Sequence, residues 1–212
     1  EMDQLLDYLN THGALEEYMT LTKQLSLLEG KQNRINDYQK IIKEYDTMIS
    51  NIKLDYAAQV RQTDIYLEEQ EDYIKNLKET FHFFAKEFYP EKKNGLLIRN
   101  NKGENKLRFN IEAKIEDDQS DGVNEVKIFC FDLLILLSKI SKMRFLFHDS
   151  RLFANMDPRQ RQILFKIMND EKISKEFQYI CSANEDTLQS VESLMSEDEY
   201  KTMIEDNIIL EL

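Results

Sequence analysis

The sequence predicts an α/β lobe that follows a long helical coiled-coil arm, and three observations support this fold class. Residues 1–89 contain no proline and carry apolar residues at heptad spacing, which is typical of a coiled coil. In residues 95–115 two apolar segments flank a polar turn at 100–105, which favours a β-hairpin. Residues 145–149 (Phe-Leu-Phe-His-Asp) are a short apolar run that ends in an acid, which indicates a buried strand of a parallel sheet.

Composition excludes several classes of protein. The 212 residues include 28 Lys and Arg against 40 Asp and Glu, and this net charge of -12 argues against a surface that grips nucleic acid as a whole. Cys130 and Cys181 lie inside apolar runs and indicate buried thiols rather than a disulfide or metal framework. No apolar stretch approaches about 18 residues, so we expect a cytoplasmic protein without a membrane span. Because the chain starts in helical sequence without Met, we also expect a fragment.

The arm is predicted over residues 1–89, and the globular lobe over residues 90–212. Two apolar stripes define the seam of the arm. One consists of Leu21, Leu28, Ile35, Ile42, Ile49 and Tyr56, and the other of Tyr38, Tyr45, Ile52, Tyr66 and Tyr73. Gln24, Lys31 and Gln59 interrupt this seam, so we expect weak self-association and antiparallel pairing with another segment. The alternative is a long helix packed on a globular body. Residues 11–13 (Thr-His-Gly) predict a bend, and the aromatic residues of 81–89 are expected to dock onto a hydrophobic head.

Ser120 and Gly122 precede a helix whose apolar face begins at Val126. A Ser and a Gly at a helix N-terminus can form an anion site, because the free amides and the helix dipole point outward. The alternative is a helix cap formed by Ser120 or Asn124, with nothing bound.

Asp149 follows the predicted strand directly. In open α/β sheets ligands lie beyond the carboxyl ends of the strands, and a carboxylate there can hold Mg²⁺ beside a nucleotide phosphate, as a Walker B acid does. The alternative is a core strand followed by an ordinary turn acid. Downstream, Asp157 is predicted to cap a helix that starts at Pro158, and further strands are predicted at 177–181 and 208–212.

The order of these segments resembles the C-terminal half of an SMC-like ATPase of the ABC class. Residues 119–122 (Gln-Ser-Asp-Gly) are similar to the signature motif of that family, and residues 145–149 to its Walker B strand. Residues 155–157 (Asn-Met-Asp) look like its D-loop, and residues 178–184 like the strand that leads to its switch residue.

A narrower resemblance rests on residues 122–128 (Gly-Val-Asn-Glu-Val-Lys-Ile) and 148–153 (His-Asp-Ser-Arg-Leu-Phe). These stretches resemble a bacterial branch of SMC-like proteins that carries a C-terminal domain of unknown function. That branch is associated with multi-component anti-phage defence systems.

The resemblance implies a site that two heads share. The signature residues that would bind ATP held by a second head are Ser120, Asp121, Gly122 and Asn124. Asp149 would hold the metal, and Asp157 would belong to the D-loop. Two catalytic positions depart from the family pattern, because Ser150 stands where a Glu commonly polarises the attacking water, and Asn184 stands where a His is common. Ser and Asn are poor bases near neutral pH, so slow hydrolysis is implied.

A phosphate-binding loop of the form Gly-x-x-x-x-Gly-Lys-Ser/Thr does not occur in these 212 residues. The resemblance implies that an N-terminal Walker A lobe supplies it, and that ATP and Mg²⁺ are the cofactors of the intact protein. ATP would clamp two heads into a homodimer, and hydrolysis would release them and move the arms. Accessory proteins and DNA are the further partners considered. The alternative function is a non-catalytic coiled-coil adaptor that keeps an ABC-like lobe.

Overall fold

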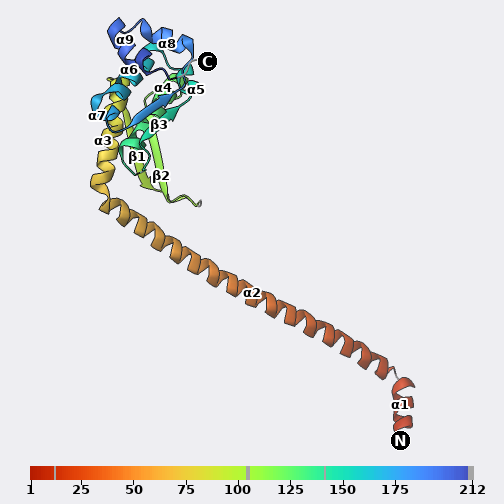
Figure 1. Ribbon diagram of the computed structural model, residues 1–212. Coiled ribbons are helices and arrows are strands. Elements are labelled where there is room, and N and C mark those ends of the chain that lie inside the picture. Colours follow the sequence, from red (N-terminus) through yellow and green to blue (C-terminus); the bar gives the residue numbers. More distant parts are fainter. Residues whose placement is uncertain (12, 104–105, 141, 210–212) are drawn as a thin grey trace. The chain divides into compact units, whose positions relative to one another are not determined.

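The computed structural model describes residues 1–11, 13–103, 106–140 and 142–209 (Figure 1). It is helix-rich and contains two small sheets. The chain divides into two compact units, Glu1–Arg61 and Gln62–Leu212, so the boundary predicted after residue 89 lies inside the second unit. Within the described residues, no helix combines the length and the apolar character that crossing a membrane requires.

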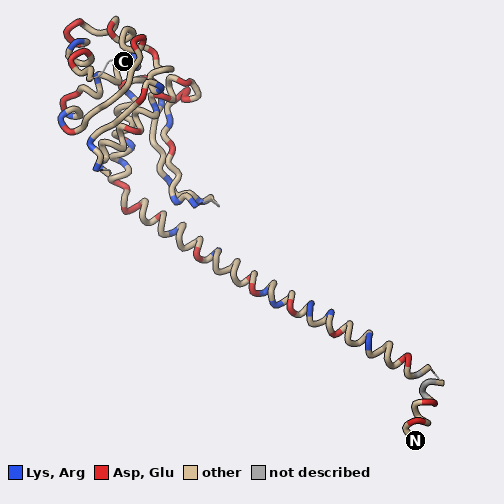
Figure 2. Tube along the Cα trace, turned by 45° about the vertical axis from the view of Figure 1, so that its right-hand side comes forward, with Lys and Arg blue, Asp and Glu red and all other residues tan. Residues whose placement is uncertain are grey.

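The first unit is built from helix α1 (Met2–Thr11) and the greater part of helix α2 (Ala14–Glu69). Between them Gly13 has a φ of 66°, which glycine adopts without steric cost. A break is therefore present where residues 11–13 predict one, although His12 lies outside the described residues. The helix α2 then runs for 56 residues without interruption, and acidic and basic residues are spread along its length (Figure 2).

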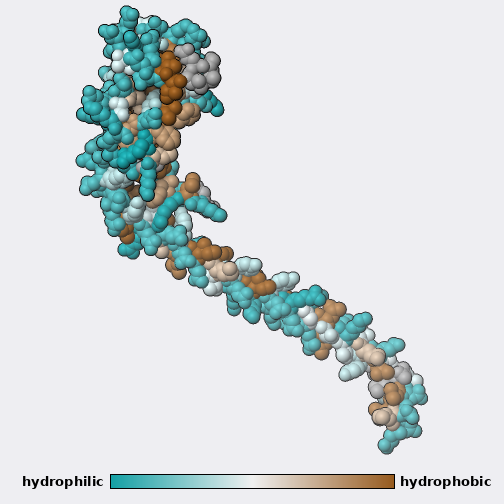
Figure 3. Space-filling view, viewed as in Figure 1, coloured by the Kyte–Doolittle hydropathy of each residue, from teal (hydrophilic) through white to brown (hydrophobic). Residues whose placement is uncertain are grey.

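The predicted seam of the arm is exposed along α2. Its exposed members include Leu21, Leu28, Ile35, Ile42 and Ile49. Figure 3 shows apolar side chains between hydrophilic ones on this helix. An amphipathic helix gains most of its stability from packing its apolar face, so an exposed seam is consistent with an arm that pairs with another helix. That pairing stays a prediction.

In the second unit, helix α3 (Glu71–Phe88) packs through its C-terminal half against the core. Phe81, Phe84 and Phe88 are buried, and so is Tyr89, which caps the end of the helix. The docking predicted for the aromatic residues of 81–89 is therefore present for these four, whereas Phe83 is 59% exposed.

The two sheets have two strands each. Strands β1 (Asn94–Asn100) and β2 (Phe109–Ile115) pair antiparallel, as predicted for the hairpin, whose predicted turn lies partly outside the described residues. Strands β3 (Phe145–His148) and β4 (Gln178–Cys181) pair parallel, with Phe145 opposite Gln178 and His148 opposite Cys181. Figure 1 shows β3 beside α4.

The prediction of a buried strand at 145–149 is corrected for one face of β3. His148 is buried and Leu146 is half-buried, but Phe145 and Phe147 are 46% and 57% exposed. Successive side chains of a strand point to opposite faces, and in the part of the chain that the structure describes this sheet has only two strands. One face therefore packs on the core and the other stays open.

The remaining helices of the second unit follow β2 along the chain. They are α4 (Asp121–Leu137), α5 (Ser150–Ala154), α6 (Pro158–Asn169), α7 (Glu171–Ser174), α8 (Glu185–Glu192) and α9 (Glu197–Met203), followed by the 3₁₀ turn η1 (Glu205–Asn207). The core centres on α4, where Val126, Phe129 and Leu133 are completely buried. They form one cluster with Phe88 of α3 and Leu164 of α6.

The strand predicted at 208–212 is not found where the structure describes it. Residues 208–209 follow η1 in no regular element, and residues 210–212 lie outside the described residues. Ile208 and Ile209 are 43% and 87% exposed, so their apolar side chains lack the buried face that would hold a strand in register.

Candidate functional site

Asp149 lies directly beyond the carboxyl end of β3, as predicted. It is exposed, and its Oδ1 accepts a hydrogen bond from the Arg151 amide at 3.0 Å, which makes it the N-cap of α5. The acid therefore has a structural role as a cap, while Oδ2 takes no part in that bond. Both interpretations of this residue, the turn acid and the metal ligand, are compatible with this geometry.

Ser150, Ser182 and Asn184 lie at the same edge of the sheet, because the carboxyl ends of parallel strands meet at one edge. The Ser150 amide donates to Ser182 Oγ at 3.0 Å, and the Ser182 amide donates to the His148 carbonyl at 3.1 Å. Asn184 follows as the exposed N-cap of α8. We call Asp149, Ser150, Ser182 and Asn184 the sheet-edge group.

His148 points away from this group into the core. Its Nε2 lies 3.1 Å from Asp132 Oδ2, and its Nδ1 lies 3.1 Å from the Tyr179 hydroxyl. Burial raises the pKa of Tyr179, so the phenol keeps its proton and can donate to Nδ1. Because a carboxylate only accepts, the contact between Nε2 and Asp132 places a ring hydrogen on Nε2. This network anchors the last residue of β3 before Asp149.

Ser120 is the N-cap residue of α4 by its backbone, which is extended at φ -72° and ψ 132°. Its carbonyl accepts the Asn124 amide at 2.9 Å, but its side chain makes no capping bond. Ser120 and Asp121 are exposed, and Asn124 is half-buried. The Ser120 hydroxyl is therefore not used as the helix cap that was the alternative to an anion site.

Gly122 fits closely against the segment that resembles a D-loop. A Cβ at this position would lie 2.7 Å from the Asn155 carbonyl oxygen and 3.3 Å from Gln160 Oε1, which is too close for any side chain. The structure thereby brings residues 119–122 and 155–157 together, although they are distant in sequence.

Asp157 caps α6 in a reciprocal pair with Gln160. The Asp157 Oδ1 accepts the Gln160 amide, and Gln160 Oε1 accepts the Asp157 amide, both at 2.8 Å. The remaining donor of the Gln160 side chain, Nε2, bonds the Tyr89 hydroxyl at the end of α3. Sequence reasoning missed Gln160 as a site residue. The spacing of Gln160 from Asp157 matches a capping box, which a sequence displays. Its contact with Tyr89 has no such signal in the sequence.

The donor set allows one kind of metal site. In the described ranges, His, Cys, Asp and Glu residues form no group of three or more that could hold a metal ion. A site that offers one carboxylate, as the end of β3 does with Asp149, suits Mg²⁺, because this ion commonly takes most of its ligands from phosphates and water. The assignment of Asp149 as a Mg²⁺ ligand stays a prediction.

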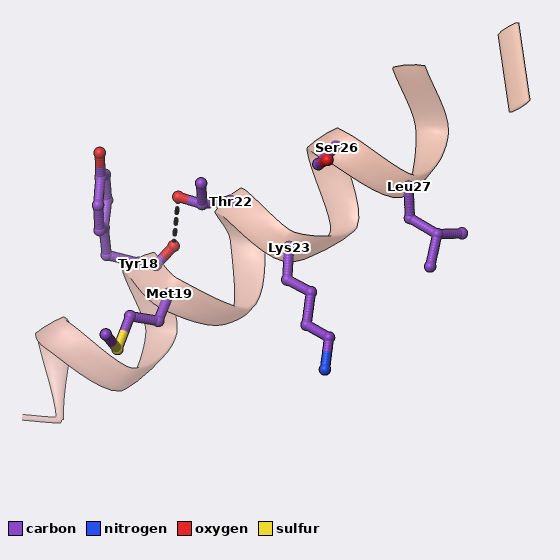
Figure 4. Close-up of a pocket in the computed structure, with 6 residues that line it drawn as sticks. All are labelled: Tyr18, Met19, Thr22, Lys23, Ser26 and Leu27. Carbon is purple, nitrogen blue, oxygen red and sulfur yellow. Dashed lines mark hydrogen bonds between the residues drawn. The ribbon is translucent and has the colours of Figure 1, made fainter. Parts of the chain in front are cut away.

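A surface hollow on α2 does not form a ligand site. Its lining residues, Tyr18, Met19, Thr22, Lys23, Ser26 and Leu27, come from successive turns of one helix (Figure 4). The Thr22 hydroxyl donates to the Tyr18 carbonyl at 2.8 Å within that helix. All described residues that line the hollow lie on this one helix, so they do not enclose a small molecule.

Comparison with curated proteins finds no match. A solved structure described as an SmcHead bound to the C-winged helix domain of ScpA is 16% identical with a TM-score of 0.43, and the match covers 57% of this chain and 38% of that one. Another, described by ATP-driven dimerization and DNA stimulated activation of SMC ATPases, is 16% identical with a TM-score of 0.40 and coverages of 61% and 78%.

These two matches are too distant to carry a conclusion about function, and the chain spans well under half the length of the first structure. The family comparison is stronger, because residues 84–212, more than half of the chain, match a single family model. The chain therefore belongs to the family described as "Uncharacterised protein conserved in bacteria (DUF2326)".

Proposed function

We propose that this chain is the C-terminal part of an SMC-like, ABC-class ATPase in which ATP joins two heads and so moves the helical arms. In this proposal Ser120 and Gly122 contact the phosphates of ATP held by a second head. Asp149 holds Mg²⁺ in its own head. From the resemblance we infer a setting in anti-phage defence or another DNA-related process, with accessory proteins as further partners.

The contact of Gly122 with the Asn155 carbonyl carries the proposal. It joins the signature-like and D-loop-like segments on one surface and requires glycine for a packing reason. The hydroxyl of Ser120 beside it is exposed and unused by the helix cap. A helix start of this kind, with its amides and dipole directed outward, suits a phosphate.

The sheet-edge group supports the second half of the site. Asp149 extends a parallel strand at the edge where ligands of open α/β sheets bind. Mg²⁺ there would neutralise phosphate charge. Ser150 and Asn184 stand at the positions where the better-known relatives place catalytic groups, and their side chains are weak bases, so we propose slow turnover.

The open face of β3 supports a further lobe. Parallel sheets are buried on both faces in folded proteins, but Phe145 and Phe147 are exposed here. A lobe that packs on this face of the sheet and carries the Walker A loop would cover these two side chains. We propose that the nucleotide is bound only when that lobe is present.

The test is ATP-dependent association of the intact protein, measured by sedimentation with and without ATP and Mg²⁺. Ser120→Arg should abolish the association by filling the anion site, and it should leave the fold intact because Ser120 is exposed and its side chain caps nothing. Ser174→Arg is the matched control, because Ser174 is exposed at the end of α7. It should associate like the parent.

If Ser120→Arg associates with ATP as the parent does, the assignment of the signature residues is wrong. If the parent itself neither binds ATP nor associates with it, the ATPase proposal fails. The non-catalytic adaptor would then be favoured.

A further inference from the structure

Gln160 joins three parts of the second unit through one buried side chain. It is 5% exposed. Its Oε1 accepts the Asp157 amide at 2.8 Å, and its Nε2 donates to the Tyr89 hydroxyl. The same Oε1 lies against the start of α4, 3.3 Å from the position that a Cβ of Gly122 would occupy.

The end of α3 is attached to the start of α6 by a second contact. Arg159 Nη1 donates to the Phe88 carbonyl at 2.6 Å, and its guanidinium lies 5.6 Å from the centre of the Tyr89 ring. The ammonium group of Lys92 lies 5.0 Å from the same ring centre. Consecutive residues of α6, Arg159 and Gln160, therefore hold the last residues of α3.

From these contacts we infer that Gln160 is a positioning residue, which sets the first turns of α4 and α6 relative to the end of α3 through Tyr89. A buried amide must keep its bonds, because an unpaired polar group in the core is costly. If α3 shifts, Gln160 follows Tyr89. Its Oε1 then moves relative to both the Asp157 amide and Gly122. The meaning of this arrangement for phosphate binding rests on the proposed function, whereas the link itself does not involve nucleotide.

Tyr89→Phe separates the link from the packing around it. The substitution removes only the hydroxyl, keeps the ring under Arg159 and Lys92, and leaves Gln160 Nε2 without its partner. Tyr200→Phe is the matched control, since Tyr200 lies half-buried in α9 and takes no part in the link.

The first measurement is amide hydrogen exchange of the full chain. In Tyr89→Phe, the amides of Asp157 and Gln160 should exchange about fivefold faster, the factor expected for the net loss of one ordinary hydrogen bond. The Asn124 amide in the first turn of α4 should follow, although Tyr89 does not contact it through any bond described above. The amides of the β1–β2 hairpin should not change, and Tyr200→Phe should match the parent at Asp157, Gln160 and Asn124.

Unchanged exchange at Asp157 and Gln160 would overturn the link. Faster exchange confined to those two amides, with Asn124 unchanged, would also overturn it. So would equally faster exchange in the hairpin, because a general loss of stability would accelerate both regions.

The second measurement is ATP-dependent association of the intact protein. Tyr89→Phe should weaken it about fivefold, while Tyr200→Phe should not. If the parent associates and Tyr89→Phe equals it, the positioning role is wrong although the proposed function stands. If the parent does not associate at all, the proposed function fails, and the hydrogen exchange alone decides the link.

Discussion

Gly122→Ala tests the packing between the start of α4 and the D-loop-like segment. A Cβ at this position would meet the Asn155 carbonyl oxygen at 2.7 Å. The neighbour is a backbone atom, which cannot swing aside as the end of a flexible side chain can. Either α4 or the segment from Asn155 to Asp157 must shift to accommodate one methyl group.

The magnitude follows from two opposed terms. Overpacking a well-packed site by a methyl group typically costs about 1–3 kcal/mol, and a clash with backbone belongs in the upper half of that range. Replacing Gly by Ala in a helix stabilises it by ~1 kcal/mol. The free energy of unfolding should therefore fall by about 1–2 kcal/mol, which lowers Tm by about 2–8 °C for a unit of this size.

Gly95→Ala is the matched control in the same unit, because a Cβ at Gly95 would meet nothing within 4 Å. Glycine in a strand costs roughly 0.5–1 kcal/mol relative to alanine, so this variant should melt at the same temperature as the parent or higher. Thermal unfolding followed by circular dichroism gives both values. A Gly122→Ala variant that melts at or above the temperature of Gly95→Ala would refute the close contact and, with it, the reason for glycine in the signature-like segment.

Three further predictions concern the sheet edge. Asp149→Asn keeps the helix cap, since Asn caps as well as Asp, but should weaken Mg²⁺-dependent ATP binding of the intact protein about tenfold or more; calorimetric titration showing parent affinity would contradict this. Ser150→Glu should raise ATP hydrolysis on the order of 10²-fold, because it supplies a carboxylate that can polarise the attacking water. The local fold should be kept, since the bond to Ser182 uses only the Ser150 amide. Phosphate release measures the rate, and an unchanged rate would count against the base position. Burial raises the pKa of Cys181 to about 11, so the contribution of its thiol to stability is complete below about pH 8.5 and is lost as the pH rises through 11. In denaturant unfolding, the free energy of unfolding of Cys181→Ala should therefore fall less steeply with pH over this window than that of the parent. Equal slopes for the two proteins would contradict this contribution of Cys181.

Local signals in the sequence predict the boundaries of the site elements. Helix α4 begins at Asp121, directly after Ser120, and α6 begins at Pro158 after the Asp157 cap, because capping chemistry and proline act within a few residues of a helix end. The end of β3 before Asp149 follows from an apolar run that stops at a charge. Each of these features depends on neighbours in the chain, which a sequence displays.

The contacts that join the elements could not be predicted in this way. Gln160 and Tyr89 are 71 residues apart, and only the folded core brings them into contact. The close fit of Gly122 against Asn155 is likewise a property of two packed segments, and a glycine in sequence indicates only that a side chain is absent. The open face of β3 also escaped prediction, because a short apolar run does not show how many strands or layers surround a strand.

The exposed aromatic face of β3 has a consequence for solubility. Among the described residues β3 pairs only with β4, and a strand with apolar side chains and an unpaired edge is a template for pairing with another copy, which is how aggregation begins. Charged residues that flank such a run act as gatekeepers, and Lys142, Arg144 and Asp149 are exposed around Phe145 and Phe147. The acid proposed to hold Mg²⁺ thus also places an exposed negative charge directly beside the apolar strand. Neutralising Asp149 removes one of the three charges, so such variants will aggregate at lower protein concentrations than the parent.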